Sequence, residues 1–295
     1  MRDSHVGTVV LGDGSPAFDP AVLAADLREV ADLYQRLRPH VDSPAWRAPT
    51  RGWTMAQAVA HLDVMTATGL SAIDDAVAGR RPVFDGIADR RGLEAWNETT
   101  IRRRLDEGGD LLGSLVACLR RSAERAEQLT VAQLTATVEL PIYNAPLPVV
   151  DLLGIQTFHP GLTHAAQVVD AVDRPPLWAG LQPATRYRMI TRLARALGWL
   201  YWPDRGGPDG LTISIRIDGP AGGDWHVVGT PDGAEGGTGR PADPDLTLGF
   251  RDLTVACRMF TGRLPLLRSL LRRDLRLRGD VRILRRFSTI FSADG

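Results

Sequence analysis

The stretch QTFHPGLTHAAQVVDA, residues 156–171, decides the fold of this chain. Its apolar residues recur at the spacing of an amphipathic helix, and His164 lies beside the apolar stripe. The segment GWTMAQAVAHLDVM, residues 52–65, has the same period and places His61 on the flank of its own stripe. Helices of a bundle turn such faces toward one another, so imidazoles from separate helices can meet in the core. The chain has six histidines, and three of them form a candidate metal site: His61, His159 and His164.

A histidine beside an apolar stripe is more often a hydrogen-bonded core residue than a metal ligand. Two histidines five residues apart, with a third on another helix, shift the balance toward a metal. Both interpretations stay open from the residues alone.

Composition bounds the function classes. A chain of 295 residues with 44% hydrophobic residues can form two domains, each with its own core. The formal net charge of zero gives no general attraction to nucleic acid or to an anionic membrane. Every basic residue is an arginine, which is typical of a GC-rich genome, so the arginine content is not a functional signal. Even the run RRDLRLRGDVRILRR, residues 272–286, fits a solvated face over a buried stripe rather than a nucleic-acid surface.

Cysteine usage and hydropathy indicate the compartment. Cys118 and Cys257 lie far apart in apolar helical segments, which favours core thiols in a reducing cytoplasm. No run of 18 apolar residues occurs, and no basic region followed by an apolar one opens the chain. We therefore expect a cytoplasmic protein with neither a transmembrane span nor a signal peptide.

The first half of the chain predicts an antiparallel four-helix bundle. Helices are expected over residues 19–37, 54–78, 92–128 with a break at Gly108 and Gly109, and 148–172, with a loop or short hairpin at 129–148. Proline stops the last helix within DRPPLW, residues 173–178. This division gives a loosely held arm (1–18), a bundle (19–175) and a second domain (176–295).

The second half is expected to be α+β. A helix over 183–200 precedes LTISIRI, residues 211–217, whose apolar residues alternate as in a strand with one buried face. WHVVG and DLTLGF indicate further strands, separated by a Gly- and Pro-rich loop at 229–244. Helices are expected at 251–260 and 264–273, followed by a strand and a helix within 275–287.

These residues carry a resemblance to a known family. The segment PTRGWTMAQAVAHLDVM, the pair Trp96–Asn97 and the helix bearing HAAQVVDA resemble the N-terminal domain of the mycothiol-dependent maleylpyruvate isomerase family, a branch of the DinB-like four-helix metalloproteins. The segment from DLTLGF to RILRRF looks like the sterol-carrier-protein-type domain that follows it in the same family. The resemblance spans nearly the whole chain. It implies a DinB-like bundle followed by a sterol-carrier-like α+β domain.

The resemblance also implies a divalent metal, typically zinc, with ligands on the second and fourth helices. His61 and His164 match the first and last ligands, but Pro160 stands where the family has its middle ligand. His159 is one position further back, and on an ideal helix residues five apart point about 140° away from each other. Pro160 favours a kink or bulge that re-aims His159, because it removes a backbone donor and clashes with the preceding turn. The alternative is a degenerate metal site retained as scaffold.

Family members use mycothiol as a thiol co-substrate. A metal with three protein ligands keeps a fourth position open, and a coordinated thiol loses its proton. The resemblance therefore implies thiol addition to an electrophilic carbon, with His61, His159 and His164 as catalytic residues, and Arg216 and Arg258 are candidates for thiol binding.

We expect a mycothiol-dependent transferase or isomerase that acts on a small organic metabolite. The altered ligand spacing favours S-transfer or thiol exchange in specialised metabolism over maleylpyruvate isomerisation. The alternatives are a metal-free DinB-like protein that binds an apolar small molecule or lipid, and a metal-free enzyme that catalyses a rearrangement. No nucleic-acid or membrane partner is expected, and the chain is expected to be a monomer or a homodimer.

Overall fold

A computed structural model gives the fold. It describes residues 15–41, 43–48, 53–82, 87, 90–140, 143, 145–165, 167–169, 172, 174–202, 210–220, 222–231, 233–260 and 264–291. Most of the expected arm, residues 1–14, lies outside the described residues. Where the arm is described it is held rather than loose, because Ala17 and Phe18 are buried in the core.

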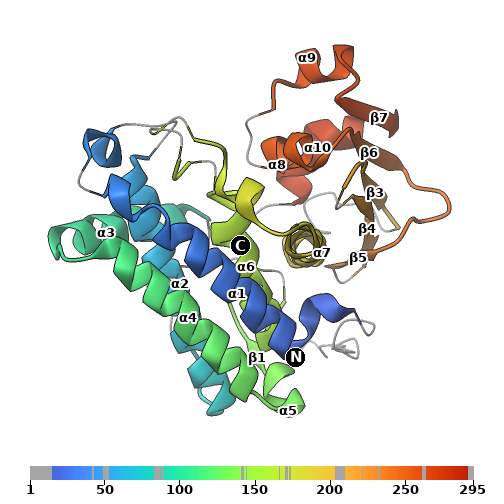
Figure 1. Cartoon of the computed structure of the whole chain (residues 1–295). Coiled ribbons are helices and arrows are strands. Elements are labelled where there is room, and N and C mark those ends of the chain that lie inside the picture. Colours follow the sequence, from blue (N-terminus) through green and yellow to red (C-terminus); the bar gives the residue numbers. More distant parts are fainter. Residues whose placement is uncertain are drawn as a thin grey trace.

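The first half is helical, as its periodicity predicts (Figure 1). Two of these helices begin where the sequence predicts, because Asp19 accepts hydrogen bonds from the first turn of its helix and Thr54 forms a capping box with Gln57. Gly108 and Gly109 adopt positive φ angles of 68° and 79° and separate the third helix from the fourth. The long helices are α1 (Pro20–Gln35), α2 (Met55–Val77), α3 (Arg90–Asp106), α4 (Leu111–Gln128) and α6 (Val149–Phe158).

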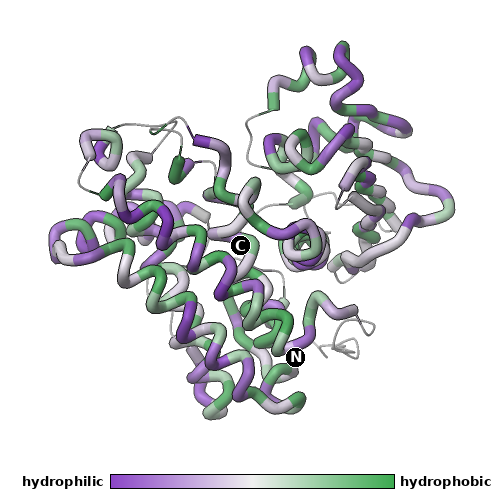
Figure 2. The backbone as a smooth tube through the Cα atoms, in the orientation of Figure 1, coloured by the Kyte–Doolittle hydropathy of each residue, from purple (hydrophilic) through white to green (hydrophobic). Residues whose placement is uncertain are grey.

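Helices α1, α2, α4 and α6 pack on one another, and hydrophobic and hydrophilic stretches alternate along them (Figure 2). The segment expected as a loop or short hairpin contains one helical turn, α5 (Val131–Leu134), and a hairpin of β1 (Thr137–Val138) and β2 (Leu147–Pro148). The prediction that the last helix of this half continues to residue 172 is wrong. Helix α6 ends at Phe158, and a π turn, His159–Thr163, follows it.

The second half forms a five-stranded sheet with the order β5-β4-β3-β6-β7. Strand β3 pairs in parallel with β6, and the other neighbours are antiparallel. The strands are β3 (Thr212–Ile217), β4 (Gly223–Thr230), β5 (Gly233–Thr238), β6 (Leu246–Phe250) and β7 (Leu275–Gly279). The helices are α7 (Pro183–Trp199), α8 (Leu253–Phe260), α9 (Leu266–Leu271) and α10 (Arg282–Ile290).

Strand β5 contradicts the loop expected at residues 229–244. Its Gly236 is required by close approach to α7, because a Cβ there would lie 2.0 Å from the carbonyl oxygen of Ala194. Gly198 of α7 approaches β5 in the same way, with its Cβ position 2.6 Å from the carbonyl oxygen of Ala234. A glycine-rich sequence that appears to be a loop is therefore an edge strand under a helix.

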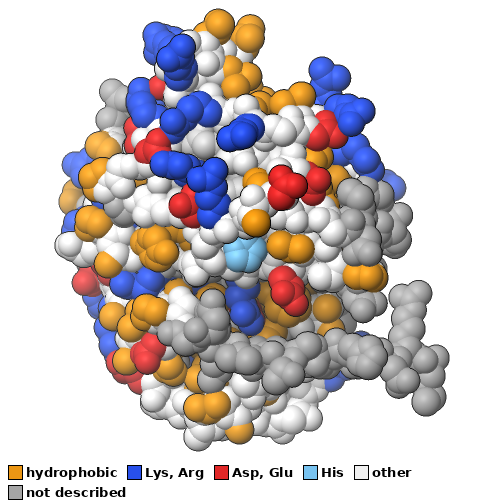
Figure 3. Space-filling model, turned by 90° about the vertical axis from the view of Figure 1, so that its right-hand side faces the viewer, with side chains coloured by type: hydrophobic (Ala, Val, Ile, Leu, Met, Phe, Trp, Pro, Cys, Tyr) orange, Lys and Arg blue, Asp and Glu red, His pale blue; other side chains and the backbone are white. Residues whose placement is uncertain are grey.

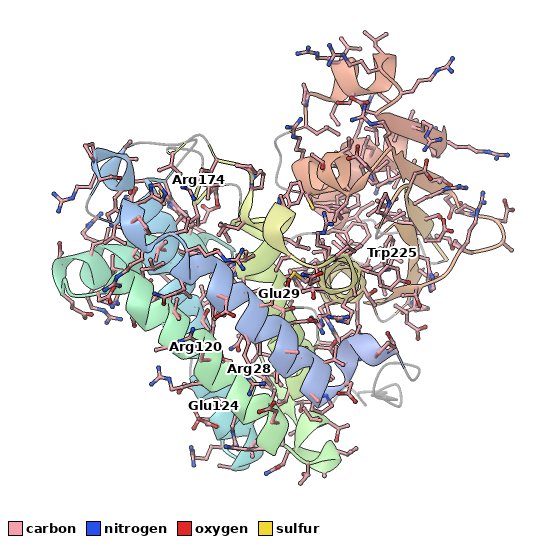
Figure 4. All side chains as sticks on the ribbon, in the orientation of Figure 1. Arg28, Glu29, Arg120, Glu124, Arg174 and Trp225 are labelled. Carbon is pink, nitrogen blue, oxygen red and sulfur yellow. The ribbon has the colours of Figure 1, made fainter. Side chains whose placement is uncertain are left out.

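Helix α7 lies between the helical layer and the sheet, and Figure 1 views it along its axis. Toward the helices, Arg192 and Arg188 form ion pairs with Asp26 of α1. Toward the sheet, the indole nitrogen of Trp225 donates to the Thr191 hydroxyl at 2.9 Å, and Figure 4 places Trp225 beside α7. One hydrophobic core runs through both halves.

None of the described helices combines the length and the apolar character needed to cross a membrane.

Candidate functional site

The π turn changes which residues of the 156–171 stretch share a face. The backbone N–H of His164 donates to the carbonyl oxygen of His159 at 3.1 Å, a bond between residues five apart. Pro160 lacks the N–H that an α-helix would use there, and its own carbonyl accepts from the Tyr34 hydroxyl at 3.0 Å. The distortion predicted at Pro160 is confirmed.

This turn and helix α2 gather three imidazoles at one point. The ring centroid of His61 lies 5.2 Å from that of His159 and 4.9 Å from that of His164. The ligand atoms of the three rings lie within 4.8 Å of one another. Across the described ranges, this is the group of three or more histidine, cysteine or carboxylate side chains that is close enough to hold a metal ion.

The spacing of the ring nitrogens fits a common cation. The Nε2 atoms of His159 and His164 lie 3.1 Å apart. Two imidazole nitrogens bound at about 2.0–2.1 Å to one tetrahedral zinc are separated by roughly 3.3 Å. The donor set also fits, since histidine is a frequent ligand of zinc and three protein ligands are usual at catalytic zinc sites.

Burial keeps His61 and His159 in the neutral form that binds metals. Burial, reinforced by the proximity of His164, lowers the pKa of His61 to about 3. Burial also lowers the pKa of His159 well below its usual range, with smaller contributions from the other two rings. An imidazole offers a lone pair only when that nitrogen is unprotonated, so the site is ready for a cation at neutral pH.

Three further side chains surround the cluster. The Gln167 carbonyl oxygen faces Nδ1 of His164, and because that oxygen only accepts, the proton belongs on Nδ1 and the lone pair of Nε2 faces the cluster. Asn97 of α3 lies next to His61, and its Oδ1 is buried with no hydrogen-bond partner among the described residues. The Trp53 ring lies 4.7 Å from the His61 ring and stacks on His164 at 5.8 Å.

The sequence signals for these three residues were present but unspecific. Gln167 follows His164 by three residues, and Trp53 directly precedes the cap of α2. Asn97 is part of the Trp96–Asn97 pair that carries the family resemblance. Their contacts with the histidines depend on the π turn and on the docking of α3, which periodicity does not specify.

The two arginine candidates lie elsewhere on the chain. Arg216 is an exposed residue of β3 whose guanidinium pairs with Asp218 at 3.0 Å. Arg258 is an exposed residue of α8, a helix that contacts the π turn of the histidine cluster. The structure therefore places the helix of Arg258, but not Arg216, next to the segment that carries His159.

No protein-family model and no curated protein sequence matches the chain. One solved structure, the crystal structure of the mycothiol-dependent maleylpyruvate isomerase, matches with a TM-score of 0.50 and 17% identity, over 84% of this chain and 90% of that chain. A mutant of that isomerase matches with a TM-score of 0.49 and 16% identity over the same shares. The chain is thus similar in fold to the mycothiol-dependent maleylpyruvate isomerase, as a distant relative would be, and at this identity the likeness concerns the fold alone.

Proposed function

We propose that this chain is a metal-dependent enzyme that uses a low-molecular-weight thiol, with mycothiol as the first candidate, to act on a small electrophilic metabolite. The observation that carries the proposal is the convergence of His61, His159 and His164, with the Nε2 atoms of the last two 3.1 Å apart. The similarity to a mycothiol-dependent isomerase supports the thiol. The reaction class is S-transfer or thiol-assisted isomerisation.

The three histidines would hold a divalent cation, with zinc as the first choice. When bound, the ion supplies Lewis acidity and lowers the pKa of a thiol from its ordinary value of about 8.5, so that the thiolate is available at neutral pH. Three neutral imidazoles add no negative charge, which leaves the full charge of the ion to act on the thiol.

The surrounding residues prepare the histidines for that task. Gln167 fixes the tautomer and the ring orientation of His164, and Asn97 lies next to His61. Trp53 covers two of the rings and excludes water from one side of the cluster. Exclusion of water strengthens the electrostatic interactions within the site.

The proposed chemistry begins when the thiolate sulfur forms a bond to an electrophilic carbon of the substrate, and the electron pair of a carbon–carbon double bond moves onto the conjugated carbonyl group. In isomerisation, the resulting single bond rotates and the carbon–sulfur bond breaks, which restores the double bond and releases the thiolate. In S-transfer, the carbon–sulfur bond remains and the adduct takes up a proton. Neither route needs an oxidant or a reductant.

We also propose a division of the chain into two domains with different roles. Residues 19–175 correspond to the DinB-like bundle that carries the cluster, and residues 176–295 to a sterol-carrier-like α+β domain. Arg258 is the better placed of the two candidates for thiol binding, because α8 contacts the π turn. Arg216, which pairs with Asp218, is the weaker one.

Metal analysis of the purified protein, joined to a thiol assay, tests the proposal. We expect close to one divalent ion per chain, lost in His164→Ala and retained in His226→Ala, a matched histidine on β4 outside the cluster. The protein is then incubated with mycothiol, ergothioneine or glutathione and a panel of electrophiles. Consumption of the thiol and the electrophile is expected to stop when the metal is chelated and to return when zinc is added. Activity that survives chelation would favour a metal-free rearrangement. A protein that never takes up metal and consumes no thiol would favour a binding module, in which the 3.1 Å contact is a hydrogen bond between two rings.

A further inference from the structure

Helix α9 exposes a ridge of leucines. Leu267 and Leu271 are 74% and 79% exposed, and Leu266 and Leu270 are 42% and 37% exposed. They lie at positions i, i+1, i+4 and i+5 of the helix, so they form one continuous face. Ser269 is the buried residue of α9. Among the described residues, the other large hydrophobic side chains with comparable exposure, Val131 and Val281, belong to other elements.

Arginines lie directly behind this ridge. A cavity of about 280 Å³ between α8 and α9 is lined by four arginines and one carboxylate, that of Asp274. The carboxylate is already bound by Arg251. Arg268 of α9 and Arg272, which directly follows α9, are four residues apart and line the cavity together. The four arginines are Arg251, Arg258, Arg268 and Arg272.

The positive charge continues over the neighbouring surface. From residue 264 to residue 291 the chain has eight arginines and two aspartates. Figure 3 shows apolar and basic side chains side by side at the top of the molecule, where α9 lies in Figure 1. The zero net charge of the whole chain therefore hides a strongly cationic end.

The chemistry of the ridge selects its partner. A second copy of the chain would bring two cationic surfaces together, which like-charge repulsion opposes. The residues that contribute most to binding at protein interfaces are enriched in tryptophan, tyrosine and arginine and poor in leucine, whereas the exposed apolar face of α9 consists of leucine alone. Leucines on one face with arginines on the other are the composition of helices that lie in the interface of an anionic bilayer.

We propose that α9 docks on a bilayer that contains anionic phospholipid. The leucine ridge (Leu266, Leu267, Leu270 and Leu271) inserts at the boundary between headgroups and acyl chains, and the arginine-lined cavity takes a headgroup phosphate. Guanidinium groups suit this ligand because their parallel N–H groups match two phosphate oxygens at once. This peripheral contact is distinct from membrane spanning. It departs from the absence of a membrane partner expected from the overall charge.

Vesicle flotation of the full chain tests the docking. We expect binding to phosphatidylcholine vesicles that contain phosphatidylglycerol and none to pure phosphatidylcholine. The double variant Arg268→Ala with Arg272→Ala should weaken binding about thirtyfold, since each arginine near an anionic surface contributes about a factor of five. Leu267→Ser with Leu271→Ser should weaken binding at least about tenfold and leave its salt dependence unchanged. Exposed residues away from α9 supply matched controls, Val131→Ser for the leucines and Arg103→Ala for the arginines, and neither should change binding.

Four results would overturn the proposal. The first is equal binding to both kinds of vesicle, and the second is binding that the α9 variants do not change. A third is an absence of binding to either kind. Saturable binding of an acidic peptide that the leucine variants abolish, without binding to vesicles, would assign the ridge to an acidic protein instead. Circular dichroism and thermal unfolding of each variant should match the wild type, because these side chains are exposed.

Discussion

The Nε2 atoms of His159 and His164 lie 3.1 Å apart although five residues separate them in the chain. On a regular α-helix these side chains would point to different sides. The π turn at Pro160 brings the two side chains to the same side and directs both rings toward His61 of α2. The candidate metal site thus depends on a local backbone irregularity as much as on the identity of its ligands.

Replacing Pro160 tests this dependence. In Pro160→Ala the backbone regains an N–H, which favours an ordinary α-helical turn and rotates His159 away from His164. We expect zinc affinity to fall at least about tenfold, with a melting temperature equal to or above that of the wild type. Pro183→Ala, at the first position of α7, is the matched control and should not change zinc affinity. Unchanged affinity in Pro160→Ala would show that the turn does not depend on the proline.

The buried histidines should make the metal-free protein sensitive to acid. Burial lowers the pKa of folded His61 from 6.5 to about 3, and His159 shifts in the same direction. Below pH 6.5 the unfolded chain therefore binds more protons than the folded one. The contribution of such a group to the free energy of unfolding is fully present above that pH. It is lost at about 1.4 kcal/mol per pH unit as the pH drops toward 3.

Denaturant unfolding at about pH 7 and about pH 5 measures this loss. His61→Gln should remove the part of this pH dependence that His61 contributes. Equal pH dependence in the wild type and His61→Gln would mean that His61 titrates normally in the folded protein.

The contact between α7 and β5 should tolerate no side chain. Gly236→Ala would place a Cβ 2.0 Å from the carbonyl oxygen of Ala194, so α7 must move away from the sheet. We expect a loss of at least about 2 kcal/mol in the free energy of unfolding. In the neighbouring Gly237→Ala the new Cβ is 3.4 Å from the His226 ring, an ordinary contact, and the change should stay within about 0.5 kcal/mol. Similar losses in the two variants would contradict the proposed contact.

Removing one partner from the buried ion pairs that join α7 to α1 should strongly lower the free energy of unfolding. The side chains of Asp26 and Arg192 are each 1% exposed, and burial lowers the pKa of Arg192 to about 10. Asp26→Asn leaves a buried guanidinium without its counter-charge and should cost about 3–5 kcal/mol in unfolding free energy. Glu127→Gln breaks the exposed pair with Arg28 and should cost far less, because solvent screens that pair. Thermal or denaturant unfolding compares the two, and equal costs would refute the argument from burial.

Local sequence rules predicted the helices and most strands of this fold. Caps such as Asp19 and Thr54, and breaks such as Gly108 and Gly109, depend on chemistry within a few residues, and the structure confirms them. The mixture of helices with a C-terminal sheet follows from the change of period after residue 200. Strand β5 was not predicted, because its Gly236 is required by contact with α7, which lies far away in sequence.

The candidate site was predictable in its residues but only partly in its geometry. Proline at residue 160 predicted the distortion, whereas the early end of α6 and the contacts of Trp53, Asn97 and Gln167 arise from tertiary packing. The exposure of the α9 leucines was not predicted from the sequence. Whether a helix of six residues turns its leucines inward depends on the elements around it, which periodicity does not show.

X-ray absorption spectroscopy of the zinc-loaded protein tests the central claim most directly. The account predicts one zinc per chain with three imidazole nitrogens at about 2.0–2.1 Å, and a loss of imidazole scattering in His159→Ala. Zinc that is bound only by oxygen ligands, or a spectrum that is the same in the wild type and His159→Ala, would contradict it.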